Sequence, residues 1–276
     1  MIEFAQVTAS YDDDLAVLHD VSFTINDGDF VAFVGTNGAG KSTTMRLING
    51  LLKPSAGEVL IDKMPTTQLK TSELARKMGF LFQNPDRQIC CNTVREELLF
   101  GFSVQGEVGQ AELDRVDALI EQFGFNPDDE PYLLNRGTRQ LLALASIIVM
   151  EPPVVILDEP TTGLDYRECE KVMGIVRQLN EGGTTVVMVC HDMEVVGDFA
   201  QRVIAMTAGQ VVADGPTFEV LRNSEVLKAA HILPPQITEI SLALNQNCAQ
   251  LPLPIAQANT VDEMVCALVD VEKGGF

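Results

Sequence analysis

Residues 35–42 read Gly-Thr-Asn-Gly-Ala-Gly-Lys-Ser, and this short segment constrains the fold more than any other. The apolar run 30–34 precedes it, as expected for a strand buried on both faces of a sheet, and a helix is expected from Lys41. Glycines let the backbone curl around a phosphate and direct N–H groups at it, and the positive end of the helix adds to the attraction. This strand–loop–helix context predicts a phosphate-binding loop.

The residue types within this loop predict how it binds Mg-ATP. Lys41 should bridge the β- and γ-phosphates, Ser42 should ligate Mg²⁺, and Thr43 should reach the α-phosphate. The residues expected to contact the nucleotide here are Gly35, Asn37, Gly38, Ala39, Gly40, Lys41, Ser42 and Thr43.

A second acidic feature follows the four apolar residues 154–157, where Asp158 and Glu159 stand in succession. Buried strands rarely end in two carboxylates without a reason, because the charge must be paired or must ligate a metal. We expect Asp158 to contact Mg²⁺ through water. Glu159 is expected to orient and deprotonate the water that attacks the γ-phosphate.

The chain alternates strands and helices around a helical insert. Residues 2–35 alternate apolar and polar side chains with turn signals, which predicts short antiparallel strands. Residues from about 84 to 150 change to helical periodicity, with helices expected near 93–100, 112–123 and 139–150. Further strands are expected at 59–61, 79–82, 154–157, 185–190 and 203–206.

The composition shifts again beyond Gly215, where Pro234-Pro235 and residues 251–254 break the chain. Thr260, with Glu263 three residues later, predicts a capping box at the start of a last helix. The apolar residues expected on one face of that helix are Val261, Met264, Val265 and Leu268. We therefore expect a main domain over residues 1–216 and a C-terminal helical appendage over 217–276.

Charge and composition exclude several classes of protein. The formal net charge of −20 argues against a nucleic-acid-binding protein, which needs a basic surface to displace counterions. The apolar runs fall far short of a membrane span, and the N-terminus shows no basic segment leading into an apolar one, so no signal peptide is expected. The six cysteines show no Cys-x-x-Cys spacing and are expected to be free thiols.

Residues 158–165, Asp-Glu-Pro-Thr-Thr-Gly-Leu-Asp, resemble the Walker B and D-loop segment of ATP-binding-cassette (ABC) proteins. The resemblance places Asp165 in the D-loop. It makes Gln83 the Q-loop glutamine, which senses Mg²⁺ and the transport partner, and His191 the switch histidine, which touches the γ-phosphate. Tyr11 matches the aromatic residue that stacks on adenine, although a solvated strand tyrosine is an alternative interpretation.

The signature segment departs from the pattern of that family, which usually reads Leu-Ser-Gly-Gly-Gln. Here residues 134–138 read Leu-Asn-Arg-Gly-Thr, so Gly137 is kept and Asn135 replaces the serine. Asparagine is also a good helix N-cap, so the helix end should survive. By the resemblance, Asn135 and Gly137 meet the nucleotide of the opposite subunit, and we hypothesise that the replaced serine slows hydrolysis there.

Residues 82–89, Phe-Gln-Asn-Pro-Asp-Arg-Gln-Ile, resemble the Q-loop of energy-coupling-factor (ECF) ATPases more narrowly. Leu233-Pro234-Pro235-Gln236-Ile237 is similar too. The resemblance implies a P-loop α/β cassette with a mixed sheet, an antiparallel subdomain and an appendage that helps two subunits pair. It also implies a second identical or related ATPase, a transmembrane T component and an S component that binds a vitamin, cobalt or nickel. The expected location is the cytoplasmic face of the membrane.

Three alternatives stay open at this point. The first is the ATPase of a conventional ABC importer, which the Asn84-Pro85-Asp86 segment disfavours. The second is a cassette ATPase acting on DNA or ribosomes, which fits poorly with a single acidic cassette. The third is a phosphoryl-transferring kinase, in which His191 and the signature segment would have no role.

Overall fold

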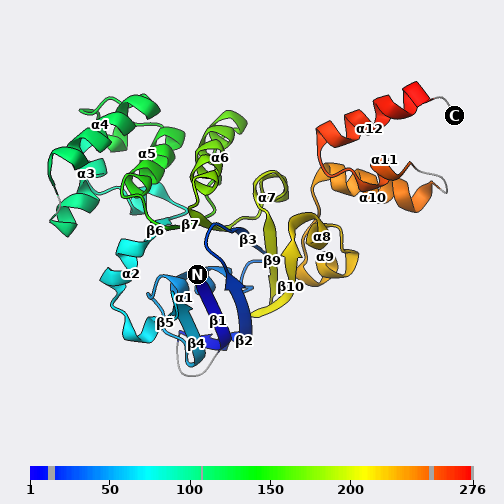
Figure 1. Cartoon of the computed structure of the whole chain (residues 1–276), viewed down its shortest axis with the longest axis horizontal. Helices are drawn as coiled ribbons and strands as arrows, with labels where there is room; N and C mark the ends of the chain where they lie inside the picture. Colours follow the sequence, from blue (N-terminus) through cyan, green and yellow to red (C-terminus); the bar gives the residue numbers. More distant parts are fainter. Residues whose placement is uncertain (12–15, 107, 249–251, 275–276) are drawn as a thin grey trace.

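The computed structural model describes residues 1–11, 16–106, 108–248 and 252–274, and two β-sheets organise this part of the chain. Figure 1 shows the sheets at the centre, one group of helices at the left and another at the right. The two termini lie in different parts of the molecule, since the N-terminus begins a central strand and the C-terminus ends the far group of helices.

The first sheet is four-stranded, in the order β2-β1-β4-β5. Its strands pair antiparallel and alternate in burial, so that Ile2, Phe4, Val7 and Ala9 of β1 face inward. The strands are β1 (Ile2–Ser10), β2 (Ala16–Ile25), β4 (Ala56–Ile61) and β5 (Met64–Pro65). The predicted antiparallel subdomain is therefore confirmed.

The second sheet is six-stranded, in the order β10-β9-β3-β8-β7-β6. All its neighbours pair parallel except β10, which runs antiparallel to β9, so the predicted mixed sheet is confirmed. The strands are β3 (Phe30–Val34), β6 (Met78–Leu81), β7 (Val154–Asp158), β8 (Thr185–Val189), β9 (Arg202–Thr207) and β10 (Gln210–Pro216).

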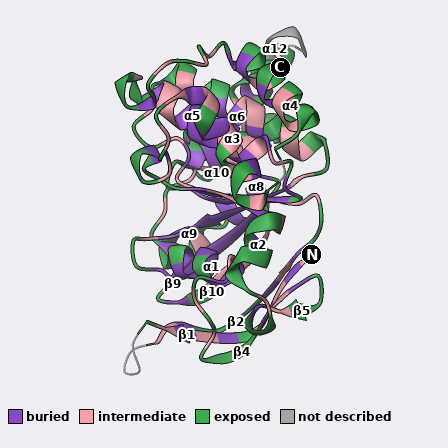
Figure 2. Cartoon of the chain, turned by 90° about the vertical axis from the view of Figure 1, so that its left-hand side faces the viewer, coloured by how far each residue is buried: buried purple, intermediate pink, exposed green. Residues whose placement is uncertain are grey.

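The unbroken apolar run of β3 is explained by two cores that meet on opposite faces of this sheet. Phe30, Ala32 and Val34 pack into the core beneath the helices, whereas Val31 and Phe33 pack into the core shared with the first sheet. Figure 2 shows this sheet as a buried layer between the helices and the antiparallel strands. A strand with both faces buried has no position for a polar side chain.

The helical insert consists of α3 (Val94–Gln105), α4 (Gln110–Phe123) and α5 (Arg136–Ile148). A capping box of Thr93 and Glu96 starts α3, and Gly106 ends it in the left-handed region. Helix α5 begins three residues earlier than the sequence predicted, because the Asn135 side chain accepts a hydrogen bond from the Thr138 N–H at 2.8 Å. The remaining helices before the C-terminal group are α1 (Lys41–Ile48), α2 (Thr71–Lys77), α6 (Tyr166–Glu181) and α7 (Met193–Phe199).

The C-terminal helices fall into two packing groups. Helices α8 (Thr217–Leu221) and α9 (Ser224–Ala230) pack on β9 and β10, and their Leu221 and Ala230 belong to the core beneath the helices. Helices α10 (Gln236–Asn247), α11 (Leu253–Gln257) and α12 (Val261–Gly274) form a separate small core around Ile255, Ala258, Met264 and Ala267. The predicted boundary at residue 217 thus precedes two helices that pack on the main sheet. The division into two domains stays a prediction.

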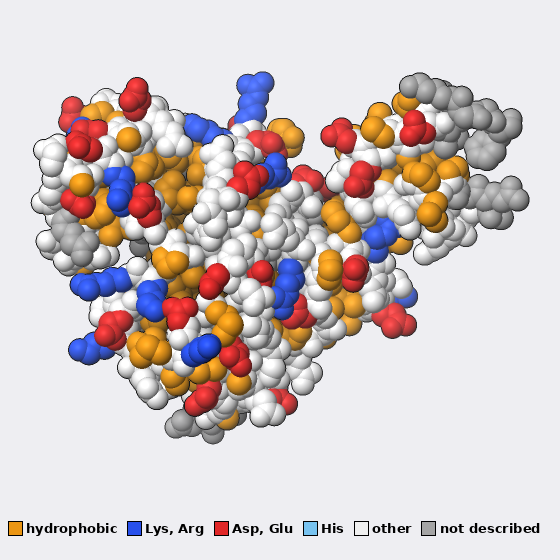
Figure 3. Space-filling model, in the orientation of Figure 1, with side chains coloured by type: hydrophobic (Ala, Val, Ile, Leu, Met, Phe, Trp, Pro, Cys, Tyr) orange, Lys and Arg blue, Asp and Glu red, His pale blue; other side chains and the backbone are white. Residues whose placement is uncertain are grey.

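The last helix starts as expected, since the Glu263 N–H donates to Thr260 Oγ1 at 3.2 Å. Its predicted apolar face is mostly exposed, with only Met264 buried while Val261, Val265 and Leu268 keep 61%, 51% and 49% of their surface accessible. Figure 3 shows hydrophobic side chains gathered over α10–α12.

Within the described residues, no helix combines the length and the apolar character that crossing a bilayer requires.

Candidate functional site

The predicted phosphate loop connects β3 to α1 and depends on glycine at two positions. Gly35 has φ 135°, and a Cβ on it would lie 2.1 Å from the Met206 backbone oxygen. Gly40, the N-cap of α1, has φ 101° and has no room for a Cβ beside Leu18. The loop can therefore wrap tightly in front of the helix N-terminus only with glycine at these positions.

Lys41 is the first residue of α1, at the end of this loop, and is almost fully buried, with 6% of its surface exposed. Its Nζ donates to the backbone oxygens of Gly35 at 2.6 Å and Thr36 at 2.9 Å, so the ammonium group is held at the centre of the curl. Burial lowers the pKa of Lys41, while the charges of Glu159 and Asp158 act in the opposite direction. A desolvated cation in this position attracts phosphate strongly.

Two carboxylates lie at the carboxyl end of β7. Burial, and after it the charge of Glu159, raises the pKa of Asp158. Glu159 has φ 49°, in the left-handed region, and its N–H donates to the Val189 oxygen of the neighbouring strand at 2.9 Å. This turn directs two successive carboxylates to one edge of the sheet, where a cation would relieve their repulsion.

Side chains from three further segments converge on Glu159. Gln83 Nε2 donates to Glu159 Oε2 at 2.6 Å, Thr162 Oγ1 donates to the same oxygen at 2.9 Å, and His191 Nε2 lies 3.0 Å from Oε1. Gln83 follows β6 and His191 follows β8, the two strands that flank β7 in parallel. Since parallel strands end at the same edge, the topology brings the predicted glutamine, glutamate and histidine together.

Two adjoining cavities collect most of the predicted site residues. A cavity of about 280 Å³ is lined by Tyr11, Asn37, Gly38, Gly40, Lys41, Ser42, Thr43, Glu159 and His191, together with Val17 and Val189. Ser42 also lines a second cavity of about 510 Å³ with Gln83 and Asp158. These last three are the predicted Mg²⁺ ligands, and their hydroxyl, amide and carboxylate oxygens are the hard donors that Mg²⁺ prefers.

Tyr11, the predicted adenine-stacking residue, is half exposed at the mouth of the smaller cavity. Its hydroxyl lies 3.1 Å from Thr43 Oγ1 and accepts from Arg46 Nη1 at 3.2 Å. The Arg46 guanidinium also lies 5.5 Å from the centre of the ring. Arg46 was not predicted from the sequence, because an arginine in the last turn of a helix is already explained by its favourable interaction with the helix dipole. Stacking of Tyr11 on adenine stays a prediction.

The predicted signature and D-loop residues lie outside the two cavities. Asn135 caps α5, and Asp165 caps α6 by accepting the Glu168 N–H at 2.8 Å. A Cβ on Gly137 would lie 1.9 Å from Glu168 Oε1, so a larger residue here would require the Glu168 side chain to move. These three residues therefore lie at the N-terminal ends of α5 and α6, outside the cavities that contain the phosphate loop.

Arg136 connects the N-terminal end of α5 to the catalytic edge, the edge of the sheet that carries Glu159. It was not predicted as a site residue. Its Nη2 donates to the backbone oxygen of Thr162 at 2.8 Å, and Thr162 in turn donates to Glu159. No sequence pattern predicts this contact, because the usual signature of the family has glycine at this position.

A phosphate loop, two carboxylates on the adjacent strand, and a glutamine and a histidine on either side define a P-loop NTPase of the ATP-binding-cassette kind. The chain belongs to this family, because the family model for ABC transporters matches residues 18–162. The resemblance drawn from the sequence is confirmed.

Similar proteins narrow the relationship. The chain is 33% identical to the energy-coupling factor transporter ATP-binding protein EcfA of Methanocaldococcus jannaschii over 99% of this chain and 98% of that protein. It spans only 41% to 44% of the length of three other relatives, putative ABC transporter ATP-binding proteins that are 36% to 37% identical to it.

Two solved structures show the same fold. One is cbiO1 from Clostridium perfringens, described as part of the ABC transporter complex cbiONQ, with a TM-score of 0.74 and 31% identity over 86% of this chain and 97% of that one. The other is the cassette MJ0796, a dimer bound to ADP and Pi, with a TM-score of 0.69 and 32% identity over 79% of this chain and 99% of that one.

Proposed function

We propose that this chain is the ATP-binding and ATP-hydrolysing subunit that energises an ECF-type uptake transporter for a vitamin or for cobalt or nickel ions. The observation that carries the proposal is the position of Glu159. Its carboxylate is held by Gln83, Thr162 and His191 at the sheet edge that also carries the phosphate loop. A fixed carboxylate beside a phosphate-binding lysine is the arrangement that water attack on a γ-phosphate requires.

The side chains divide the chemistry among them. Lys41 and the N–H groups of the loop balance the charge of the phosphates, and Glu159 orients the attacking water and accepts its proton. Bound Mg²⁺ supplies further charge neutralisation and would be held by Ser42, Asp158 and Gln83. His191, which lies beside Glu159 Oε1 rather than Oε2, would contact the γ-phosphate.

Dimer formation is part of the proposal, because one chain does not complete the site. Asn135, Gly137 and Asp165 lie apart from the cavity that contains Lys41. In a nucleotide-sandwich dimer they would contact the ATP held by the other subunit, and the dimeric state of the similar cassette MJ0796 supports this arrangement. The exposed apolar residues of α10–α12 would help the two subunits pair.

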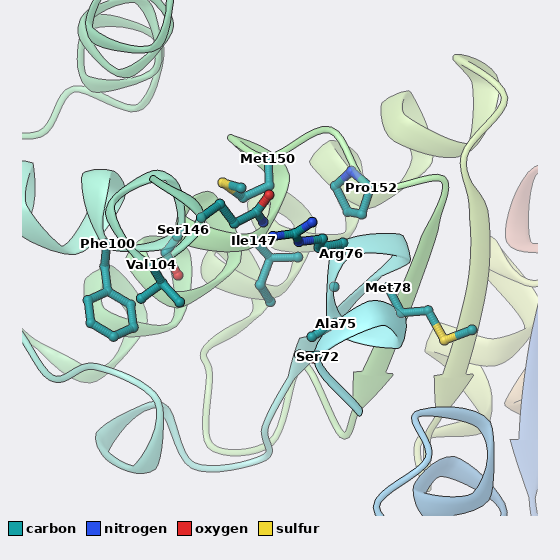
Figure 4. Close-up of a pocket in the computed structure, with 13 residues that line it drawn as sticks. Ser72, Ala75, Arg76, Met78, Phe100, Val104, Ser146, Ile147, Met150 and Pro152 are labelled. Carbon is teal, nitrogen blue, oxygen red and sulfur yellow. The ribbon is translucent and has the colours of Figure 1, made fainter. Parts of the chain in front are cut away.

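A membrane partner is proposed at the apolar pocket between α2, α3 and α5, which encloses about 350 Å³. Figure 4 shows its lining side chains coming from these three helices, from Met78 of β6 and from Met150 and Pro152 after α5, with Arg76 as the charged member. Phe100 and Val104 of α3 line it and remain 47% and 71% exposed. A cytoplasmic helix of the T component would bury these residues, and the proposed location of the chain is therefore the cytoplasmic face of the membrane.

Replacement of the proposed base tests the function directly. We expect Glu159→Gln to bind ATP as the wild type does but to release phosphate about 10²- to 10⁴-fold more slowly, the usual contribution of a general base. The variant should also accumulate as an ATP-bound dimer. Phosphate release and sedimentation with Mg-ATP measure the two effects.

Glu181→Gln, a change at the exposed end of α6, is the matched control and should hydrolyse ATP at the wild-type rate. Undiminished hydrolysis by Glu159→Gln would remove this residue from its role. Affinity purification of the chain from detergent-solubilised membranes tests the transporter type. Recovery of a conventional importer permease in place of T and S components would overturn the ECF assignment.

A further inference from the structure

Cys90, Cys91 and Glu97 form a compact group, here called the thiol–carboxylate cluster, away from the nucleotide site. One ligand atom from each residue, two sulfurs and a carboxylate oxygen, lies within 4.8 Å of the others. Cys90 is exposed, Cys91 is half-buried and Glu97 is 3% exposed. The cluster therefore has a buried carboxylate at its base and a sulfur at its entrance.

Within the described residues, the buried carboxylate of Glu97 has no positively charged partner. Among the ion pairs of the described residues, none involves Glu97. Its Oε2 accepts the N–H groups of Cys90 and Cys91, both at 2.9 Å, and these neutral donors offset part of the cost of burial. Buried charges in proteins are generally paired or ligate a metal, so this carboxylate has capacity for a cation.

The thiols share this uncompensated negative environment. Both sulfurs lie within 4.8 Å of a carboxylate oxygen of Glu97. A bound cation would reverse this balance, because a coordinated thiol loses its proton.

Two hydrogen bonds hold the segment just before the two thiols in place. Tyr132 donates its hydroxyl hydrogen to the Ile89 oxygen at 2.9 Å, and Gln88 Nε2 donates to the Ala143 oxygen of α5 at 2.8 Å. Glu97 itself lies in the first turns of α3. Since the ligands are already positioned, a metal ion would require little ordering of the chain on binding.

We propose that Cys90, Cys91 and Glu97 bind a thiophilic divalent cation of the zinc class. Two thiolates and a carboxylate select such an ion over Mg²⁺ or Ca²⁺, and water would complete a tetrahedral shell. On binding, two thiols each lose a proton to solvent and two sulfur–metal bonds form, with no change of oxidation state. The exposed Cys90 gives the ion access from solvent.

The position of the cluster gives the bound ion a consequence for the proposed function. Cys90 and Cys91 follow the segment that begins at Gln83, whereas Glu97 belongs to α3, whose Phe100 and Val104 line the proposed docking pocket. An ion that joins them would hold the Gln83 segment against α3. Binding of the ion itself does not depend on nucleotide or on a membrane partner.

The test is a titration of the reduced, nucleotide-free full chain with Cd²⁺, which reports thiolate ligands through a charge-transfer absorption. We expect one equivalent to bind and two protons to be released. Cys90→Ser and Cys91→Ser should each weaken binding at least about tenfold, since even outer partners of a bound metal contribute about 10- to 100-fold. Cys248→Ser and Cys266→Ser, at exposed cysteines elsewhere, should bind like the wild type.

Zn²⁺ should also raise the melting temperature of the wild type but not that of Cys90→Ser. Because the side chain of Cys90 is exposed, this substitution should not disturb folding, so misfolding would not explain a loss of the Zn²⁺ effect. Absence of the absorption band would overturn the proposal. So would a band that survives Cys90→Ser and Cys91→Ser or that disappears with Cys248→Ser. Because no nucleotide is present, either failure leaves the proposed ATPase function untouched.

Discussion

Asn135 stands at the residue scale as the clearest departure from the ABC pattern. Its Oδ1 is committed to the Thr138 N–H, so only its amide hydrogens could meet a phosphate across a dimer. A serine hydroxyl can accept the capping bond and still donate. We expect Asn135→Ser to raise the ATPase rate of the assembled dimer about tenfold, a change of about 1.4 kcal/mol that is close to the smallest contribution of a hydrogen bond to a charged group.

Steady-state phosphate release measures this change. Asn223→Ser is the matched control, because Asn223 caps α9 in the same way but is not part of the signature segment. An unchanged or slower Asn135→Ser dimer would contradict the expectation.

Asp158 yields a prediction for pH dependence. Its pKa is raised in the folded chain, first by burial and then by Glu159, above its ordinary value of 3.8. The ionised carboxylate therefore lowers stability at neutral pH, and the cost disappears as the pH falls through the folded-state pKa towards that ordinary value. In the presence of a metal chelator, Asp158→Asn should melt at a higher temperature than the wild type at neutral pH, with the difference shrinking in acid.

Calorimetry at several pH values checks this, with the exposed Asp128→Asn as a control that should leave the melting temperature unchanged. A lower melting temperature for Asp158→Asn at neutral pH would count against the assigned sign. The same variant should lose Mg²⁺-dependent ATP hydrolysis.

Much of the catalytic edge could be predicted at this scale, because an apolar strand comes before or ends at each of its main residues. These residues are Lys41, Asp158, Glu159 and His191, and their order along the chain matches the family pattern. Arg46 and Arg136 could not be found in the same way. Their contacts join segments far apart in the chain, Arg46 to Tyr11 and Arg136 to Thr162, and no local pattern marks such pairs.

At the scale of elements, most strands were predicted because their burial is periodic or complete, whereas β5 and β10, which have no buried residue, were not. The start of α5 was placed three residues late, since the apolar period begins only after the cap at Asn135. The apolar face of α12 was found, but the sequence does not show that only Met264 is covered. Periodicity identifies the face of a helix and says nothing about which neighbour covers it.

Helix α3 yields the prediction that belongs to this scale. Val104→Glu places a charge on an exposed position of the docking pocket, so folding and ATP binding should be unaffected. Association with the T component should weaken by more than about 100-fold, because an unpaired charge buried in an interface costs on the order of 3 kcal/mol. Co-purification from solubilised membranes measures the effect.

Glu121→Gln, on the exposed surface of α4, serves as its control and should co-purify like the wild type. If Val104→Glu retains the T component in full, the partner docks elsewhere.

At the scale of the whole molecule, α10–α12 have a core of their own, and this separation makes their role testable. Val265→Glu together with Leu268→Glu should leave the melting temperature of the chain nearly unchanged, since both side chains are about half exposed. Dimer affinity with ATP should fall at least about tenfold, because two charges would enter an apolar contact.

Sedimentation with Mg-ATP measures that affinity. Gln246→Glu, which adds a charge to the exposed end of α10, is the control and should dimerise normally. Wild-type affinity in the double variant would exclude α12 from the dimer surface.

The link from Arg136 through Thr162 to Glu159 has a consequence for timing. In the proposed dimer, the N-terminal end of α5 contacts the γ-phosphate bound by the other subunit. The same helix end is connected through hydrogen bonds to Glu159, the proposed base of its own chain. Loss of the γ-phosphate bound by one subunit would thus alter the position of Glu159 in the other subunit. The two subunits would therefore hydrolyse ATP alternately, with Arg136 coupling the two nucleotide sites.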